Sequence, residues 1–213
     1  MCDEIVSVVM STYERNDILF TRSLPSVQRQ THEKLNINVV CDGMRGDSLI
    51  DLQTRVEGLK DPRVRLWLIP RQTYPEDPQE KWCVLGLNAR NHGLDQATAK
   101  WVAPLDDDDE WTDDHVEALL TVAKGKDVDF VYGMSKYHWP DEREQMAGRW
   151  PPGMGSFCDG AQIYRHDMGY RYDPGCIERG LPEDGDLWDR MVKGGVSFAF
   201  APTLVHHYYP NER

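Results

Sequence analysis

The sequence predicts an α/β fold whose doubly wound, mostly parallel sheet carries helices on both faces, and three observations lead to this prediction. Between residues 5 and 132, short β-branched runs alternate with segments of helical periodicity, which is the pattern of parallel sheets. Residues 5–10 (Ile-Val-Ser-Val-Val-Met) are almost continuously apolar, as strands buried on both faces are. The apolar run 101–105 leads directly into four consecutive carboxylates, Asp106 to Asp109. In α/β proteins, ligands bind at the carboxyl ends of such strands.

Strands and helices are expected to alternate along the first 132 residues. The expected strands are residues 5–10, 35–41, 64–69, 101–105 and 128–132, and the expected helices are residues 19–30, 47–60, 85–99 and 113–123. Pro25 fits the first helix only in a first turn, because proline has no backbone N–H to donate. Asp47 and Thr112 are expected to cap the second and fourth helices, whereas Gly93 is expected to interrupt the third. The three prolines of residues 70–78 predict a loop.

From residue 133 the periodicity weakens. Residues 133–160 are rich in Gly, Pro, Trp and charged residues, and long loops of this kind are commonly lids or binding loops. The aromatic side chains of this segment either pack the lid or present platforms to a ligand: Trp139, Trp150 and Phe157. Beyond it, strands are expected at residues 161–164, 196–199 and 203–209, and a helix closed by Gly194 and Gly195 at residues 181–193.

Composition and charge exclude several classes of protein. With 213 residues, 40% of them hydrophobic and 28% charged, the chain can form one domain with a real core. We expect a nucleotide-binding half up to about residue 132 and an acceptor-binding half from about residue 133. A net charge of −12 argues against a broad basic surface that grips nucleic acid. No run of about 18 apolar residues is present, so no membrane span is expected.

The cysteines and the N-terminal residues predict a cytoplasmic location. The five cysteines are scattered and form no close pairs: Cys2, Cys41, Cys83, Cys158 and Cys176. This pattern favours neither a disulfide framework nor a thiolate metal site, and it fits a reducing compartment. The first residues, Met-Cys-Asp-Glu, lack the apolar core of a signal peptide.

The acidic run at residues 106–109 is the strongest candidate for a functional site. Adjacent carboxylates repel one another, and a divalent cation would relieve that repulsion; carboxylate ligands suit Mg²⁺, Mn²⁺ or Ca²⁺. An EF-hand loop would require glycine where Trp111 stands, and a helix where Pro104 stands. A phosphatase-type Asp turn would need a hydroxyl residue earlier than Thr112. The choice that remains lies between an Asp-x-Asp metal clamp for a diphosphate and a solvated acidic loop.

Five segments, in order, resemble the motifs of family 2 glycosyltransferases. They are residues 6–15 (Val-Ser-Val-Val-Met-Ser-Thr-Tyr-Glu-Arg), 26–31 (Ser-Val-Gln-Arg-Gln-Thr), 89–94 (Ala-Arg-Asn-His-Gly-Leu), 105–111 (Leu-Asp-Asp-Asp-Asp-Glu-Trp) and 182–188 (Pro-Glu-Asp-Gly-Asp-Leu-Trp). The resemblance extends from residue 5 to about residue 208. It implies a Rossmann-like GT-A fold that moves a sugar from a nucleotide diphosphate donor, most often UDP-linked, to an acceptor hydroxyl. Mn²⁺ or Mg²⁺ is the implied cofactor.

Two features depart from the family pattern. Asp42-Gly43-Met44 replaces the usual Asp-Asp-Gly-Ser, and Cys41 stands where the family has its first Asp. Only one carboxylate, that of Asp42, is therefore expected to contact the base of the nucleotide. The sequence also stops soon after the expected catalytic core, so we expect neither the accessory modules nor the anchoring helices of some relatives.

The resemblance assigns the metal site to the acidic run. Asp108 would bridge the cation to the diphosphate, Asp106 would form the other end of the Asp-x-Asp motif, and Asp107 would reach the ribose. Asp109 is expected to be only a charge at the start of the following helix. His206 and His207 are candidates for completing the metal shell, and in a strand only one of the two can face the site. The alternative for them is a structural role in an aromatic cluster with the tyrosines at residues 208–209.

The resemblance also assigns the donor site and the base. The turn after the first strand is expected to bind the nucleotide through Ser11, Thr12, Tyr13 and Arg15, with the Tyr13 ring stacked on the base. Asp42 would accept the imide N–H of uracil, and Arg90 would lie near the diphosphate. Turn formation and a surface ion pair are the alternatives for these residues.

The general base for an inverting single displacement is assigned to Asp184, next to Glu183. The alternative is that both carboxylates only favour the N-terminus of their helix.

Two other functions remain open at this point. One is a catalytically silent module that binds nucleotide sugars or carbohydrates. The other is a nucleotidyltransferase on a related fold, although residues 11–16 lack the glycines typical of that class. The acceptor could be a glycan, a lipid-linked precursor, a protein, a small molecule or a modified base in DNA, because fold and donor site do not specify it.

Overall fold

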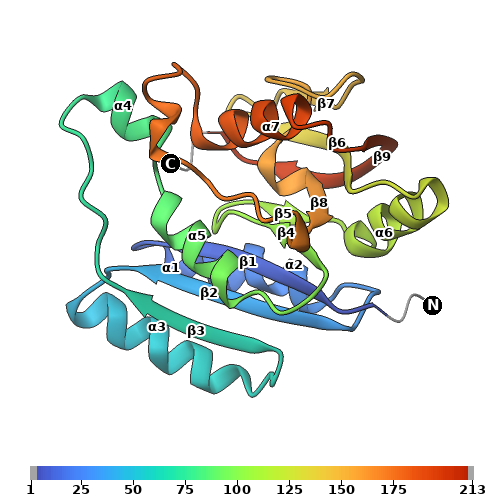
Figure 1. Cartoon of the computed structure of the whole chain (residues 1–213). Helices are drawn as coiled ribbons and strands as arrows, with labels where there is room; N and C mark the ends of the chain where they lie inside the picture. Colours follow the sequence, from blue (N-terminus) through green and yellow to red (C-terminus); the bar gives the residue numbers. More distant parts are fainter. Residues whose placement is uncertain (1–3, 211–213) are drawn as a thin grey trace.

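Strand β1 (Val6–Thr12) lies in the middle of the sheet, and its residues from Val6 to Met10 are all buried. The structure is a computed structural model that describes residues 4–210 (Figure 1). β1 pairs in parallel with β2 (Leu35–Asp42) on one side and with β4 (Trp101–Pro104) on the other. β3 (Val64–Ile69) pairs in parallel with β2 at the edge of the sheet. The carboxyl ends of these four strands therefore meet at one end of the sheet.

The remaining strands continue the same sheet in mixed orientation. After β4 the order is β8 (Gln162–Arg165), β6 (Phe130–His138), β9 (Phe198–Tyr208) and β5 (Glu110–Trp111), and β7 (Glu144–Ala147) pairs with the end of β6. β8 is antiparallel to both β4 and β6, and β9 is parallel to β6 but antiparallel to β5. The α/β class is confirmed, and the sheet is less parallel than predicted: parallel pairing joins β1, β2, β3 and β4 to one another and β6 to β9, and the other described pairs are antiparallel. The β6–β7 pair is a hairpin, which needs no helical crossover.

Helices cover both faces of the sheet. The helical segments are α1 (Asn16–Ile18), the π-helical turn η1 (Leu19–Ser23), α2 (Leu24–Gln28), α3 (Gly46–Leu59), α4 (Pro78–Cys83), α5 (Leu87–Gln96), α6 (His115–Lys126) and α7 (Glu183–Lys193), with 3₁₀ turns at Asp159–Ala161, His166–Met168 and Pro174–Cys176. Leu52 of α3 and Leu119 of α6 belong to the same core cluster as Val8, whereas Leu187 of α7 belongs to the cluster of Val9. Neighbouring residues of a strand point to opposite faces, so α3 and α6 lie on one face and α7 on the other.

The first helical segment begins at Asn16, three residues earlier than predicted, and ends at Gln28. Pro25 lies within it, directly after the π-helical turn. It therefore occupies the first turn of α2, where a missing backbone N–H is tolerated.

Both predicted helix caps are wrong. α3 begins after Arg45 and α6 after Asp114, and neither residue caps its helix through its side chain. Asp47 lies in the first turn of α3. Thr112 instead uses its hydroxyl to donate to Asp114 Oδ1 at 2.8 Å.

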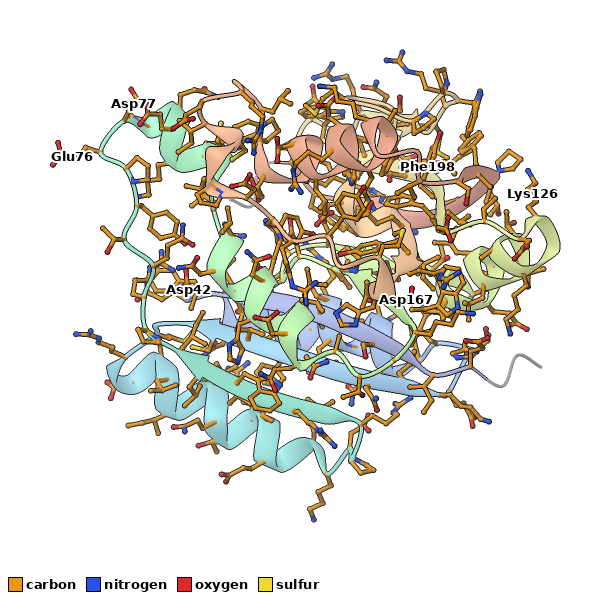
Figure 2. All side chains as sticks on the ribbon, viewed as in Figure 1. Asp42, Glu76, Asp77, Lys126, Asp167 and Phe198 are labelled. Atoms are coloured by element: carbon orange, nitrogen blue, oxygen red, sulfur yellow. The ribbon has the colours of Figure 1, made fainter. Side chains whose placement is uncertain are left out.

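The predicted helix at residues 85–99 is shorter than expected, and a further helix, α4, precedes it. α4 is capped by Asp77, whose carboxylate accepts from the backbone N–H groups of Gln79 and Glu80 at 2.9 Å each (Figure 2). Pro78 stands at the first helical position, which proline favours. The predicted loop therefore ends at Asp77, and its last proline, Pro78, starts α4.

Gly93 does not interrupt α5; it allows the helix to lie close to the sheet. A Cβ atom at this position would lie 2.4 Å from Val9 Cγ1 and 3.4 Å from Val40 Cγ2. We therefore expect Gly93→Ala to lower the free energy of unfolding by about 1–3 kcal/mol through overpacking, measured by urea denaturation. Gly125→Ala in α6 is the matched control, because a Cβ there meets nothing within 4 Å. The control should be neutral or stabilising by up to about 1 kcal/mol; equal effects in both variants would contradict the explanation.

The C-terminal part contains more sheet than predicted. Residues 133–160 begin with the extension of β6 to His138 and the hairpin strand β7, so they are not one loop. The two strands predicted at residues 196–199 and 203–209 are one strand, β9. Its register against β6 shifts between the pairs Tyr132–Phe200 and Met134–Leu204, where Pro202 lies. Proline is tolerated in a sheet at such irregularities, and it divided the apolar pattern in two.

Within residues 4–210, no helix combines the length and the apolar composition needed to cross a bilayer. The described cysteines are free thiols: Cys41, Cys83, Cys158 and Cys176. Cys2 lies outside the described residues.

Candidate active site

A cleft of about 370 Å³ lies at the carboxyl ends of β1, β2 and β4. Most residues that the sequence assigned to a site line this one cleft: Ser11, Thr12, Tyr13, Arg15, Asp42, Arg90, Asp106, Asp107, Asp108, Glu183 and Asp184. His206 and His207 are not among its lining residues. The structure therefore brings together side chains from turns that are up to 173 positions apart in the chain.

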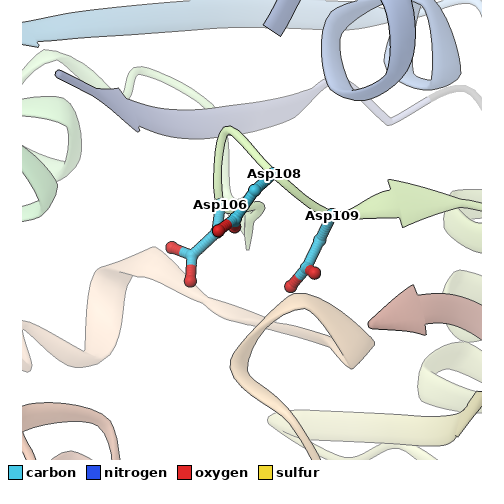
Figure 3. A group of neighbouring side chains, drawn as sticks. All are labelled: Asp106, Asp108 and Asp109. Atoms are coloured by element: carbon cyan, nitrogen blue, oxygen red, sulfur yellow. The ribbon is translucent and has the colours of Figure 1, made fainter. Parts of the chain in front are cut away.

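The acidic turn between β4 and β5 is buried. Asp107, Asp108 and Asp109 have exposed fractions of 6%, 1% and 2%, which a solvated acidic loop would not have. Carboxylate oxygens of Asp106, Asp108 and Asp109 lie within 4.8 Å of one another (Figure 3). Asp109, for which the sequence predicts only a charge at the start of the following helix, belongs to this cluster. A set of oxygen ligands at this spacing fits a hard divalent cation such as Mg²⁺ or Mn²⁺.

Arginine and backbone donors hold the acidic turn against the loop after β1. Arg15 Nη1 lies 2.5 Å from Asp108 Oδ2 and 3.4 Å from Asp107 Oδ1. The backbone N–H of Tyr13 donates to Asp107 at 3.3 Å, and Arg22 donates to the carbonyl oxygen of Asp108 at 2.9 Å. Burial raises the pKa of Asp107 to about 6, although the nearby Arg15 opposes the shift. The repulsion within the turn is thus partly balanced by cations of the chain itself.

Of the two adjacent histidines of β9, only His206 reaches the acidic cluster. Its Nε2 lies 3.2 Å from Asp109 Oδ2, and Ser135 Oγ lies 3.1 Å from its Nδ1. Burial lowers the pKa of His206, but the adjacent Asp109 outweighs it and raises the pKa to about 10. His207 instead forms a 2.8 Å contact with His138 of β6. This division follows from the alternation of side chains along a strand.

Asp42 is held at the end of β2 by the loop that follows β3 (Figure 2). Its carboxylate accepts from Arg71 Nη1 at 2.7 Å, from the Tyr74 hydroxyl at 2.7 Å and from the backbone N–H of Gln72 at 3.1 Å. The Arg71 guanidinium also lies 3.3 Å from the centre of the Tyr13 ring, a cation–π contact. Arg71 and Tyr74 line the cleft and were missed by the sequence analysis. The sequence feature that could have identified them is their position just after β3, at the carboxyl end of a parallel strand.

Gly43 permits this arrangement. Its backbone adopts φ +71°, and a Cβ there would lie 2.2 Å from the backbone nitrogen of Arg71. The glycine that follows Asp42 is therefore needed for the close approach of the Arg71 loop.

Arg90 of α5 is the centre of a buried ion-pair network. It forms short ion pairs with Asp106 and Glu183, and its Nε lies 3.7 Å from Asp159. Burial acts to lower the pKa of Arg90, but these carboxylates hold it well above its ordinary value. The guanidinium expected beside the diphosphate is therefore occupied by side chains of the chain, and it connects the acidic turn to the start of α7. Asp159, which the sequence did not point to, lines the cleft, and burial raises its pKa to about 7.

The first turn of α7 places its two carboxylates differently. Glu183 is 6% exposed and turned toward Arg90, and burial raises its pKa to about 8. Asp184 lines the cleft and accepts from the backbone N–H of Gly185 at 2.6 Å. Further along, the fully buried Asp186 pairs with Arg179 and Arg190, which ties α7 to the preceding segment.

The aromatic residues of the long loop also separate. Phe157 is buried, lines the cleft and lies 4.1 Å from the Tyr132 ring centre. Trp150 is exposed and Trp139 stacks on Tyr137, and neither lines the cleft.

Comparison with known proteins identifies the fold and supports the family. S. aureus TarS (residues 1–349, solved in complex with UDP) superposes with a TM-score of 0.70 at 15% identity, over 96% of this chain and 60% of that chain. The fold is thus the GT-A fold of glycosyltransferases. Residues 86–179 match the sequence model of glycosyl transferase family 2. This match over somewhat less than half of the chain supports the family 2 glycosyltransferase that the resemblance of the motifs predicted.

Curated relatives are glycosyltransferases. The Escherichia coli UDP-Glc:alpha-D-GlcNAc-diphosphoundecaprenol beta-1,3-glucosyltransferase WfgD is 26% identical over 62% of this chain and 46% of the relative. The Campylobacter jejuni GalNAc(5)-diNAcBac-PP-undecaprenol beta-1,3-glucosyltransferase is 31% identical over 55% of this chain and 34% of the relative. The uncharacterized glycosyltransferase R139 of Acanthamoeba polyphaga mimivirus is 29% identical over 61% and 56%. The chain thus spans from a third to somewhat over half of the length of these relatives.

Proposed function

We propose that this chain is a metal-dependent, inverting glycosyltransferase that moves a sugar from a UDP-sugar to an acceptor hydroxyl. One observation carries the proposal: a cluster of three Asp side chains that fits a divalent cation shares a cleft with the separate carboxylate of Asp184. The proposed donor site and the proposed base would thus share one cavity. The cytoplasmic location and the division into donor and acceptor halves remain predictions from the sequence.

The donor base would bind between Tyr13, Arg71 and Asp42. A carboxylate that accepts hydrogen bonds beside a guanidinium that donates them suits an N–H flanked by carbonyl oxygens, as in uracil. Asp107, which is bonded to the loop after β1, is the carboxylate proposed for the ribose. The names of the E. coli relative and of the TarS complex, which both specify UDP, support the same base.

The metal would be held by Asp108 together with Asp106 and Asp109, with His206 rather than His207 beside them. Its chemical contribution is to neutralise the negative charge that develops on the leaving diphosphate. The chain prepares this site by burying the carboxylates and balancing them with Arg15 and Arg90. Arg90 is then a positioning residue, since its guanidinium is used to orient Asp106 and Glu183.

Asp184 would act as the general base. As the acceptor oxygen attacks the anomeric carbon, the Asp184 carboxylate takes the proton of the acceptor hydroxyl, and the diphosphate leaves from the opposite side with inversion. Glu183 supports Asp184 by anchoring the first turn of α7 to Arg90. A silent binding module would have no use for a carboxylate at this position, and the match to family 2 favours glycosyl transfer over nucleotidyl transfer.

The donor site is tested by thermal melting with UDP, GDP, dTDP and CMP, each with and without Mn²⁺. A ligand at about 100 times its Kd stabilises the native state by about 2.7 kcal/mol, which for a chain of this size raises the Tm by about 5–10 °C. We expect this rise with UDP and Mn²⁺ together, and its loss in Asp108→Ala. Asp113→Ala is the control, because that carboxylate is 66% exposed and outside the cluster. No shift with any nucleotide, or a full shift in Asp108→Ala, would contradict the proposed site.

A further inference from the structure

Exposed apolar side chains gather at one part of the cleft. Trp82 of α4, Leu85 of the turn after it and Met154 of the segment before β8 all line the cleft. Their exposed fractions are 45%, 37% and 49%, whereas most other large apolar side chains are buried. Water-exposed apolar surface inside a functional cleft is costly unless a ligand covers it. We call these three residues the apolar rim.

The apolar rim lies next to the turn that carries Asp184. Met154 rests on this turn, because a Cβ at Gly185 would lie 1.9 Å from Met154 Sδ. On the other side, α4 packs beside the segment that leads into α7 (Figure 1), where the Cys176 thiol donates to the carbonyl oxygen of Cys83 at 3.5 Å. A ligand on the rim would therefore sit beside the proposed base, Asp184.

The charge of the cleft restricts the ligand further. Three cationic side chains of the described residues line the cleft, and each is already paired with a lining carboxylate. The pairs are Arg15 with Asp108, Arg71 with Asp42, and Arg90 with Asp106 and Glu183. An anionic ligand beside Asp184 would thus meet carboxylates and no unpaired lining cation, whereas a neutral ligand would not be repelled.

We propose that the apolar rim is the acceptor subsite and that it binds a neutral saccharide, with the C–H face of a pyranose ring on the Trp82 indole. A sugar ring offers both properties that this subsite requires: an apolar face for the rim and a hydroxyl for Asp184. Leu85 and Met154 border the ring and exclude water. This proposal rests on the proposed function, because Asp184 must be the base for the rim to be the acceptor side.

The test compares transfer with hydrolysis in Trp82→Ala, Trp82→Phe and the wild type. The donors are UDP-glucose, UDP-galactose and UDP-GlcNAc with Mn²⁺. The acceptors are neutral methyl β-D-glycosides of the same three sugars, the anionic methyl β-D-glucuronide, and octyl β-D-glucoside. Trp150→Ala is the matched control, because Trp150 is also exposed, at 57%, but does not line the cleft.

We expect a neutral methyl glycoside to be used in preference to the glucuronide. Trp82→Ala should raise the KM for that acceptor about tenfold, as the loss of one aromatic contact implies. Trp82→Phe should restore most of the affinity. Hydrolysis of the donor by water and the Kd for UDP should stay unchanged, since neither uses the rim, and Trp150→Ala should behave like the wild type.

Three results would overturn the inference while leaving the proposed function standing, as judged by metal-dependent donor hydrolysis. They are an unchanged KM in Trp82→Ala, no transfer to any neutral glycoside, or equal use of the glucuronide. A KM that is much lower for octyl glucoside, and that rises in Trp82→Ala for the octyl compound alone, would place an alkyl chain on the rim instead. Absence of both UDP binding and donor hydrolysis would reject the proposed function itself.

Discussion

Asp184→Asn is expected to lower kcat for sugar transfer by about 10²–10⁴-fold, the usual contribution of a general base. The amide keeps the shape of the side chain and its hydrogen bond from the Gly185 N–H, but it cannot take the proton of the acceptor hydroxyl. Binding of UDP with Mn²⁺ should be unchanged, since the acidic cluster of Asp106, Asp108 and Asp109 does not include Asp184. Radiolabelled transfer assays and the Tm shift with UDP measure the two effects separately.

Asp189→Asn is the control on the same helix. Asp189 pairs with Lys193 at 2.7 Å and does not line the cleft, so its removal should leave transfer within about twofold of the wild type. Near wild-type transfer in Asp184→Asn would remove Asp184 from the mechanism. The base would then have to be another lining carboxylate, and Asp159 would be the first to examine, because it lies in the same cleft.

Arg90→Ala is expected to lower the free energy of unfolding by about 3–5 kcal/mol, the cost of leaving buried charges without their partner. The substitution removes the only guanidinium that reaches both Asp106 and Glu183 among the described contacts. It should also abolish transfer, because the acidic turn and the start of α7 lose their common anchor. Chemical denaturation and the transfer assay provide the two measurements.

The loss of unfolding free energy that Arg90→Ala causes should grow as the pH rises. The Glu183 carboxyl has a folded pKa of about 8, above the value of about 4.3 expected for the unfolded chain. The native state therefore binds more protons than the unfolded state between these values, and stability falls as the pH rises through this window. Without Arg90 the ionised Glu183 carboxylate becomes even more destabilising in the native state. The stability lost in Arg90→Ala should therefore be smaller at pH 5 than at pH 8.

Arg55→Ala serves as the surface control for this prediction. Arg55 pairs with Asp17 and Asp51 on the outside of the molecule, where solvent screens an ion pair and its contribution to stability is small. A pH-independent loss in Arg90→Ala, or a loss no larger than that of Arg55→Ala, would contradict the account of Arg90 as a buried hub.

Much of the fold could be predicted because it depends on local pattern. The apolar run that became β1 and the alternation that became β2 and β3 carry their period in consecutive residues. The elements that were missed depend on pairing between distant residues. β9 was divided at Pro202 because its continuity comes from pairing with β6, and β7 exists because it pairs with the extension of β6. β7 is almost fully exposed, so it has no apolar period to reveal it.

The sequence by itself determined which chemical groups follow the strands. The four consecutive Asp residues, Asp42 before Gly43, and the Glu-Asp pair at residues 183–184 stand in the order of the family motifs, and this order predicted both the family and the cleft. No tertiary contact is needed to see them, because each motif is a short run of neighbouring residues.

Only the tertiary structure decided how these groups are used. It paired Arg90 with Glu183 across 93 residues, stacked Arg71 on Tyr13, and turned His206 rather than His207 toward Asp109. The physical reason is that ion pairs, ring contacts and strand register depend on the distance between side chains in space. A periodic pattern specifies which face a residue occupies, but it does not specify which distant residue it meets there.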